Sequence, residues 1–178
     1  DTGKMAYNPC KAVDPVKYKA KIRQPLTDME LEQVRSACQT LREKALFETL
    51  YATGCRVSEI VGIDYAEIDK KSRCVVITGK GDQERPVFLN AKAMFAIEKY
   101  LESRNDDNPA LFVSSKVPHG RLGKEAIERE IKAIGKRSGI GRPVFPHLMR
   151  HTFATDMLEH GASLNEVSDL LGHKKLDT

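Results

Sequence analysis

Tryptophan is absent from this 178-residue sequence, and aromatic residues make up only 6% of it. The four cysteines (Cys10, Cys38, Cys55 and Cys74) stand far apart, with neither a CxxC motif nor the spacing of a zinc knuckle. No apolar run approaches the roughly 20 residues that a membrane-spanning helix needs, and no charged-then-apolar leader opens the sequence. We therefore expect a soluble, cytoplasmic protein with reduced thiols that folds without disulfides.

Basic residues exceed acidic ones only slightly, and the net charge is +4. The basic residues are nevertheless unevenly placed: residues 1–24 hold six Lys or Arg and two Asp, and residues 113–151 hold nine Lys or Arg and three Glu. All five histidines fall within residues 119–173. This distribution suits a protein that grips a polyanion on one side, although solvated lysines on ordinary helices would explain the charge alone equally well.

The first 25 residues contain three prolines and little apolar periodicity, which predicts an extended linker. A linker at the start of a chain indicates that another domain precedes it. We expect residues 26–178 to form one domain, because their length is that of an ordinary single domain.

Helix signals dominate the rest of the chain. Apolar stripes bounded by capping boxes and glycines predict one helix that begins after Thr27, one that ends at Gly54, one that begins after Asn90, and others over 57–61, 122–138, 147–160 and 163–171. Two β-rich runs, 73–78 and 85–89, are separated by six residues with two glycines and predict a hairpin, and 111–113 predicts a further short strand. The expected fold class is α+β, mostly helical with a small antiparallel sheet.

The stretch from Val144 onward contains most of the side chains that could bind or activate a ligand. Pro146 suits the first turn of a helix, which puts His147 and Arg150 three residues apart on one face. Arg150 has a planar fork of donors, His147 can donate or accept near neutral pH, and the N-terminus of a helix favours anions. This pattern predicts a phosphate-binding site.

Matching groups occur elsewhere in the chain. Arg56 and Glu59 are three residues apart on a short helix, and Lys80 lies between two glycines at the hairpin turn. His173 follows a helix C-terminus, where carbonyl groups favour a donating imidazole. Taken singly, each has an ordinary explanation: Arg56 as a surface ion-pair partner of Glu59, Lys80 as a solvated lysine, and His151 as a core histidine.

Together, Arg56 in Thr-Gly-Cys-Arg-Val-Ser-Glu, Lys80 in Gly-Lys-Gly, the pair His147-x-x-Arg150 and the final Leu-Gly-His173 resemble the catalytic domain of the tyrosine recombinases, or phage integrase family. The resemblance covers roughly residues 25–178. It implies a catalytic-domain fold that recombines double-stranded DNA at a core site through a 3′-phosphotyrosine. It further implies a core-binding domain before the linker and a tetramer of protomers on the DNA.

The resemblance also implies a role for each matched residue. Arg56 and Arg150 would clamp the scissile phosphate, and His147 would assist removal of the proton from the nucleophile. Lys80 would protonate the leaving 5′-oxygen, and His173 would donate a hydrogen bond to the phosphate.

Two further residues are implied only as supporting groups: Glu59, which would orient the site, and His151. The family's nucleophile is a tyrosine a short distance beyond the second histidine, whereas this sequence ends five residues after His173. The five tyrosines all precede His147: Tyr7, Tyr18, Tyr51, Tyr65 and Tyr100. We therefore expect a catalytic domain truncated before the helix that bears the nucleophile, and inactive by itself.

The residue types suit phosphoryl transfer without a metal or cofactor. Two arginines can bind the non-bridging oxygens of a phosphodiester in bidentate fashion as negative charge develops on them. A phosphotyrosine conserves the bond energy, so rejoining needs no ATP, and the sequence has no GxxxxGK[ST] loop.

Three alternatives remain open. A type IB topoisomerase would use similar chemistry to relax supercoils, and a fragment without a nucleophile could serve only to bind DNA. A zinc hydrolase would use His147, His151 and His173 as ligands. Against zinc, Leu148 stands where such enzymes place a glutamate base, and Arg150 would put a cation beside the metal.

Overall fold

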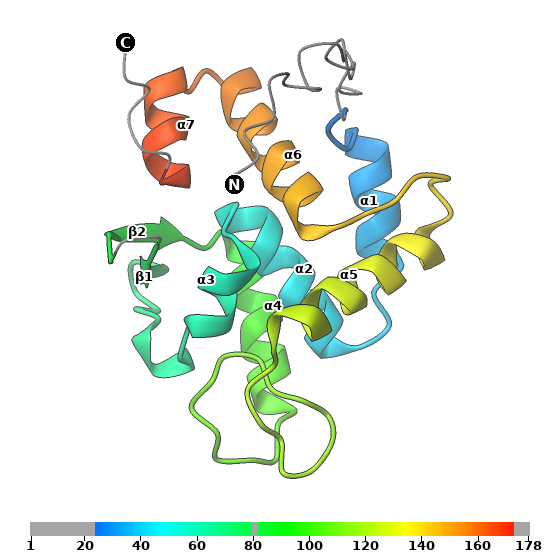
Figure 1. Cartoon of the computed structure of the whole chain (residues 1–178), viewed down its shortest axis with the longest axis vertical. Helices are drawn as coiled ribbons and strands as arrows, with labels where there is room; N and C mark the ends of the chain where they lie inside the picture. Colours follow the sequence, from blue (N-terminus) through cyan, green and yellow to red (C-terminus); the bar gives the residue numbers. More distant parts are fainter. Residues whose placement is uncertain (1–23, 80–81, 173–178) are drawn as a thin grey trace, which may run out of the picture.

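The computed structural model describes residues 24–79 and 82–172. Within these residues the expected fold class is confirmed, with mostly helices and one two-stranded antiparallel sheet (Figure 1). Most of the expected linker over residues 1–25 lies outside the described residues. The elements are α1 (Asp28–Ser36), α2 (Leu41–Thr53), α3 (Val57–Gly62), the 3₁₀ helix η2 (Tyr65–Glu67), β1 (Cys74–Thr78), β2 (Glu84–Phe88), α4 (Ala91–Glu102), α5 (Lys124–Ser138), α6 (Pro146–Glu159) and α7 (Leu164–Leu171).

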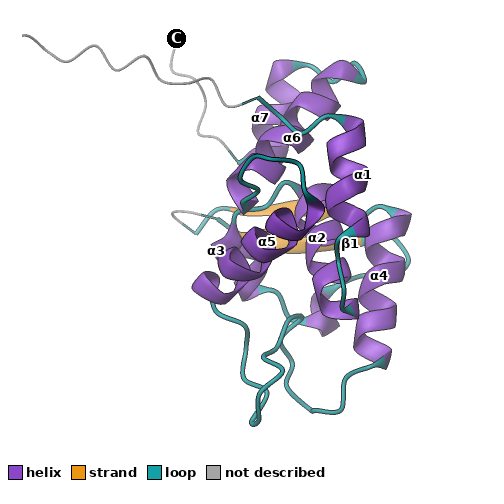
Figure 2. Ribbon diagram, turned by 90° about the vertical axis from the view of Figure 1, so that its right-hand side faces the viewer, coloured by secondary structure: helices purple, strands orange, loops and turns teal. Residues whose placement is uncertain are grey.

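Helix α2 lies at the centre and packs against α4, α5 and α6 (Figure 1). Leu46, Phe47 and Leu50 are buried in it, and the helix ends at Gly54, whose φ of 58° is the left-handed conformation that glycine adopts without strain. Figure 2 shows α3 and α5 on one side of this centre and α4 on the other. The core therefore separates two faces of the molecule.

Two acidic residues of α2 are buried, which the sequence pattern does not predict. Glu48 forms an ion pair with Arg35 of α1 at 2.5 Å, and Glu43 forms one with Arg137 of α5 at 2.6 Å. A buried carboxylate needs a cationic partner to remain charged. Each of these ion pairs therefore links α2 to a neighbouring helix, α1 or α5.

The hairpin aligns β1 with β2 so that Val75 faces Val87 and Ile77 faces Arg85. Val75, Ile77 and Val87 are buried, which leaves Val76 and Phe88 on the exposed side of the sheet. Because side chains alternate along a strand, Arg85 shares the inward side with Val87. The hairpin therefore directs one arginine toward the body of the domain.

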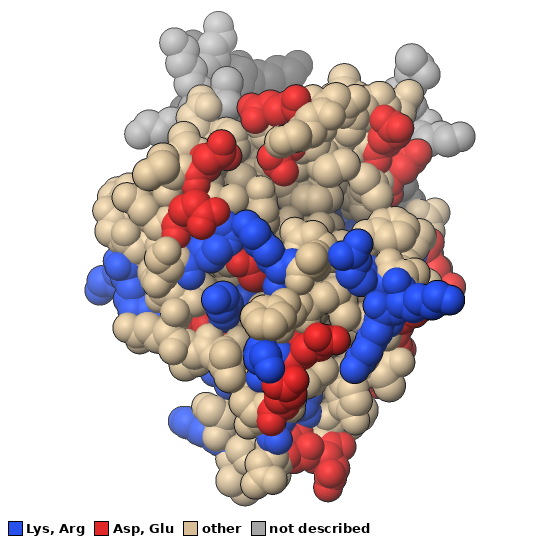
Figure 3. Space-filling view, turned by 180° about the vertical axis from the view of Figure 1, so that it is seen from behind, with Lys and Arg blue, Asp and Glu red and all other residues tan. Residues whose placement is uncertain are grey.

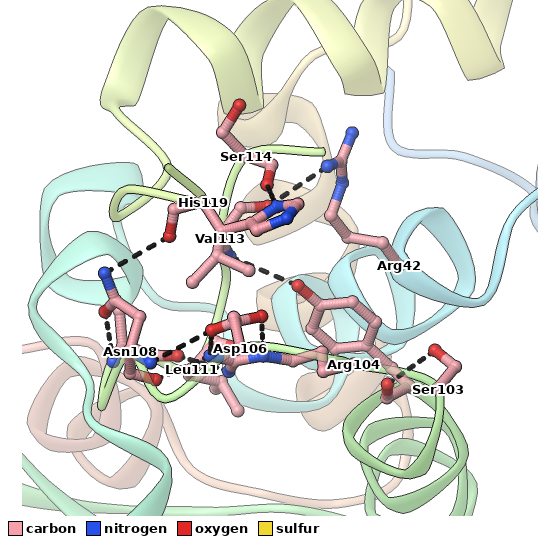
Figure 4. Close-up of polar contacts among 11 residues, drawn as sticks. Arg42, Ser103, Arg104, Asp106, Asn108, Leu111, Val113, Ser114 and His119 are labelled. Carbon is pink, nitrogen blue, oxygen red and sulfur yellow. Dashed lines mark hydrogen bonds and ion pairs between the residues drawn. The ribbon is translucent and has the colours of Figure 1, made fainter. Parts of the chain in front are cut away.

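The connection from α4 to α5 over residues 103–123 contains no strand, so the short strand predicted at 111–113 is wrong. Only isolated bridges join Ala110 to Asp64 and Val113 to Arg121. Arginine side chains donate hydrogen bonds to backbone carbonyls that, in a strand, would pair with a neighbouring strand. Arg42 donates to the carbonyl of Val113, as drawn in Figure 4, and Arg104 donates to the carbonyls of the segment around Ala110.

Arg104 is the anchor of this connection (Figure 4). Its guanidinium pairs with Asp106 and donates to the carbonyls of Asn108, Ala110 and Leu111, while its side chain is only 7% exposed. The hydrogen bonds from Arg104 keep the pKa of Asp106 below its ordinary value despite partial burial. One side chain thus satisfies several backbone groups of a segment that has no regular structure.

Replacing Arg104 with alanine is expected to lower the free energy of unfolding by about 3 kcal/mol, because it leaves Asp106 without its cation and several carbonyls without a donor. Urea unfolding followed by circular dichroism measures the loss. Lys99→Ala is the control, because Lys99 pairs with Glu102 at the surface and its loss is expected to cost at most about 0.5 kcal/mol. Equal stability of the two variants would show that Arg104 does not anchor the connection.

Cys38, Cys55 and Cys74 are free thiols, as expected; Cys10 lies outside the described residues. None of the helices in 24–79 and 82–172 has both the length and the apolar character needed to cross a membrane.

Candidate functional site

Arg56 and Glu59 form the start of α3. Arg56 is the N-cap residue, and its backbone N–H donates to Glu59 Oε2 at 2.7 Å while its Nη1 donates to Glu59 Oε1 at 2.9 Å. The Glu59 side chain is 3% exposed and that of Arg56 is 39% exposed. The pair is therefore not an ordinary surface ion pair, because a buried carboxylate holds both the backbone and the guanidinium of Arg56.

Arg85 is a partner of Glu59 that sequence reasoning missed. Its Nη1 and Nη2 donate to the two carboxylate oxygens at 2.9 Å each, and its Nε donates to the carbonyl of Leu170 at the end of α7 at 2.9 Å. Burial opposes ionisation of Glu59, but the hydrogen bonds from Arg85 and Arg56 outweigh it and keep the pKa of this carboxyl below its ordinary value. Glu59 is therefore an anion between two guanidinium groups.

Arg150 lies one turn into α6, which begins with Pro146 as expected. It is buried, and its Nη1 and Nη2 donate to the carbonyls of Gly54 and Leu171 at 2.7 Å each. These carbonyls stand at the C-terminal ends of α2 and α7, where the helix dipole favours a cation. The position of the guanidinium is therefore set by two helices that are distant in the sequence.

Burial and the nearby charge of Arg56 lower the pKa of Arg150 to about 10. The group stays charged at neutral pH, so two like charges that repel each other line one pocket. An anion between Arg56 and Arg150 would relieve this repulsion, and the electrostatics of the site therefore favour a bound phosphate.

Arg56, His147 and Arg150 line one pocket of about 460 Å³. Its walls are α3, the start of α6 and one side of α5, from which Lys124, Glu128 and Lys132 contribute at every fourth residue. His147 is exposed, so its imidazole is accessible to a ligand. The two lysines belong to the basic sector over 113–151, but no motif in the sequence distinguishes them from its other basic residues.

Of the other predicted site residues, Lys80 and His173 lie outside the described residues, so the structure does not place them. His151 is exposed and does not line the pocket, so its alternative interpretation as a core histidine is wrong. None of the described tyrosines (Tyr51, Tyr65 and Tyr100) lines the pocket either.

Cys55 lines the pocket next to Arg56, and burial raises the pKa of its thiol to about 11. The thiol is therefore protonated at neutral pH, which makes it a poor nucleophile. Cys55 is therefore a poor candidate for the attacking group, whereas the arginines and the imidazole of this pocket suit binding and activation of a phosphate.

A larger cavity of about 680 Å³ lies between the start of α1 and the end of α6. Its lining includes Asp28, Glu30, Asp156 and Glu159, with Arg142 as the basic residue. Arg142 is already bound to Glu30 at 2.5 Å. An acidic lining repels anions, so this cavity is a poorer candidate for phosphate binding than the arginine pocket.

Figure 3 shows the face opposite to that of Figure 1, and both acidic and basic side chains occur on it. The arginine pocket opens between α3 and α5, which lie on the other side of the core from α4 (Figure 2). The pocket and α4 therefore lie on different sides of the domain.

The described residues contain no group of three or more His, Cys, Asp or Glu side chains placed to hold a metal ion. The zinc alternative also needs His173, which lies outside those residues. A metal assay on the purified protein is its direct test, and stoichiometric zinc would replace the phosphate interpretation.

Comparison with known proteins agrees with the geometry. A sequence model described as the phage integrase family matches residues 24–178. The tyrosine recombinase XerD of Neisseria meningitidis serogroup B is 36% identical over 189 residues, which cover 96% of this chain and 62% of that protein. XerD of Listeria monocytogenes serotype 4b is 34% identical over 189 residues, which cover 99% of this chain and 63% of that protein. The chain thus spans about three fifths of the length of these relatives.

Solved structures give the same result. The crystal structure of XerA recombinase superposes with a TM-score of 0.80 and 32% identity, covering 90% of this chain and 58% of that one. The XerH site-specific recombinase bound to its difH substrate gives a TM-score of 0.72 and 25% identity, covering 86% of this chain and 48% of that one. The motifs, the fold and the family match all agree, and the chain belongs to the phage integrase family of tyrosine recombinases.

Proposed function

We propose that this chain is the phosphate-activating part of a site-specific DNA recombinase, which cuts and rejoins double-stranded DNA through a 3′-phosphotyrosine. The observation that carries the proposal is the convergence of Arg56, His147 and Arg150 on one pocket, although they lie on two helices about a hundred residues apart in the sequence. The comparisons support it, because its relatives are recombinases.

In the proposed reaction the tyrosine oxygen attacks the phosphorus, and negative charge grows on the two non-bridging oxygens. Arg56 and Arg150 are charged throughout, so they stabilise these oxygens without giving up a proton. His147 lines the same pocket and would take the proton of the attacking hydroxyl. Lys80 and His173 keep the roles that the family resemblance implies, as leaving-group acid and phosphate donor.

The proposed partner is duplex DNA around a recombination core site, with other protomers of the same recombinase bound beside it. Two lysines of α5, Lys124 and Lys132, line the pocket on either side of Glu128 and would contact backbone phosphates. We further propose that the protein acts in the cytoplasm, where the expected reduced thiols and bacterial DNA occur together.

DNA binding by the chain is expected to fall steeply with salt, on the order of 1,000-fold in affinity between 50 and 200 mM, because each phosphate contact releases counterions. Lys132→Ala is expected to reduce the slope of log affinity against log salt by about one. Fluorescence anisotropy with a labelled core-site duplex measures both. Lys99→Ala removes the same charge from α4 on the opposite face and serves as the control.

If the chain fails to bind duplex DNA at low salt, or binds it with no salt dependence, the proposed function is wrong. Two related activities are separated by assays on the protein extended to its tyrosine. Relaxation of supercoiled DNA without pairing of two sites would indicate a topoisomerase. Binding without cleavage would indicate a DNA-binding module.

A further inference from the structure

The guanidinium of Arg85 connects three parts of the domain next to the arginine pocket. Both of its terminal nitrogens donate to Glu59 on α3, and its Nε donates to Leu170 at the end of α7, each at 2.9 Å. Its own position is on β2 of the hairpin. The side chain is only 11% exposed, so this arrangement is not a mobile surface contact.

The backbone on two sides of this guanidinium lacks side chains. A Cβ added at Gly79 would lie 3.3 Å from Arg85 Nη1, and one added at Gly172 would lie 2.9 Å from the same atom. Arg85 therefore fills space that side chains at these positions would need. In the sequence, the two glycines directly precede Lys80 and His173.

Arg85 reaches both arginines of the pocket through shared partners. The Glu59 carboxylate that it binds also accepts hydrogen bonds from the backbone and the guanidinium of Arg56. The helix end that it holds at Leu170 continues into Leu171, whose carbonyl accepts from Arg150. Arg85 itself does not line the pocket. It therefore acts on the pocket only through other residues.

We propose that Arg85 is a positioning residue for phosphate binding. By binding both oxygens of Glu59, it fixes the carboxylate that in turn holds the backbone and the guanidinium of Arg56. By holding the end of α7, it fixes the carbonyl that orients Arg150. This inference rests on the proposed function and adds to it a residue that acts on both arginines without contacting the DNA.

Arg85→Lys is the most informative variant, because lysine keeps the charge but cannot bind both carboxylate oxygens and a carbonyl with fixed geometry. The probe is inorganic phosphate, titrated into the chain and followed by NMR of the arginine Nε–H groups. In the wild type, phosphate is expected to shift the Arg56 signal and leave that of Arg85 nearly unchanged. In Arg85→Lys, phosphate affinity is expected to fall about 10- to 100-fold. This range is taken from metal sites, where it is the usual loss of affinity when a residue that hydrogen-bonds to a metal ligand is replaced.

Arg121→Lys is the matched control. Arg121 also pairs with a carboxylate, that of Asp64, and donates to the carbonyls of Val61 and Ile63 at the C-terminal end of α3. It does not line the pocket and makes no ion pair with Glu59. It is expected to lose stability without losing phosphate affinity. Comparing the two variants separates a positioning role from a merely structural one.

The outcomes distinguish this inference from the proposed function. Wild-type phosphate affinity in Arg85→Lys, together with lost affinity in Arg56→Ala, would overturn the positioning role and leave the proposed function standing. A phosphate-induced shift of the Arg85 signal as large as that of Arg56 would also overturn it, because Arg85 would then bind the ligand directly. If Arg56→Ala kept the phosphate affinity of the wild type, Arg56 would not bind the phosphate, and the proposed function would lose its main support. The wild-type titration needs no variant to fold.

Discussion

Covalent adduct formation with core-site DNA is expected to be abolished by Arg150→Ala, in a protein that continues past Thr178 to the family's tyrosine. The guanidinium is buried between two helix ends and lines the same pocket as Arg56. Losing a single preorganised donor to a developing oxyanion typically costs about 100- to 1,000-fold in rate. Loss of a whole cation with several donors is expected to exceed that range.

Arg56→Ala is expected to have a similar effect, because the two arginines face the same space from α3 and α6. Lys99→Ala, which removes one charge from the opposite face, is the control and is expected to leave the adduct yield unchanged. The measurement is the yield of protein–DNA adduct after denaturing electrophoresis. Wild-type yield from either arginine variant would remove that residue from the proposed site.

Stability has to be followed in the same experiment. Arg150 is buried, and alanine leaves the carbonyls of Gly54 and Leu171 without the donors that they have in the wild type. Arg150→Lys keeps a cation and one donor, so it is expected to fold better than Arg150→Ala and still react poorly, because lysine cannot form the bidentate contact. A folded, unreactive Arg150→Lys protein therefore separates catalysis from folding.

The helices could be predicted because their signals are local. Thr27 and Ser163 each accept from the third helical residue, as their capping boxes indicate, and Gly54 and Gly172 end helices in the left-handed conformation. The predicted strand at 111–113 failed for the opposite reason. An apolar run reports burial, but whether it pairs as a strand depends on a neighbour that the local sequence does not reveal.

In the site, too, local sequence predicts some residues, whereas others depend on partners that are distant in the sequence. His147 and Arg150 share a face because they are three residues apart on one helix, and Arg56 and Glu59 do so for the same reason. Arg85 could not be found this way, since its partners Glu59 and Leu170 are 26 and 85 residues away and no periodicity links them. The lysines of α5 likewise join the pocket only when the helix packs beside α3.

The second large effect is expected from replacing Glu59, and it is measured as a change in the free energy of unfolding. Glu59→Gln is expected to lower the free energy of unfolding at pH 7 by about 3 kcal/mol, because the amide offers one acceptor oxygen to two guanidinium groups and leaves Arg85 buried without its counter-charge. Glu67→Gln is a matched control. Glu67 accepts a similar bond from the backbone of Asp64, but it is exposed and is expected to cost at most about 0.5 kcal/mol.

The dependence on pH provides a sharper test of the same carboxylate. The pKa of Glu59 in the folded protein lies below its ordinary value of 4.5, so its contribution is complete well above pH 4.5 and is lost as the pH falls through the folded value. The stability difference between wild type and Glu59→Gln is therefore expected to shrink on acidification. Other carboxylates with lowered pKa values, such as Glu30, are common to both proteins and cancel in this difference. A difference that stayed constant from pH 7 to below pH 4 would mean that Glu59 stabilises the fold by packing rather than as the anion between Arg56 and Arg85.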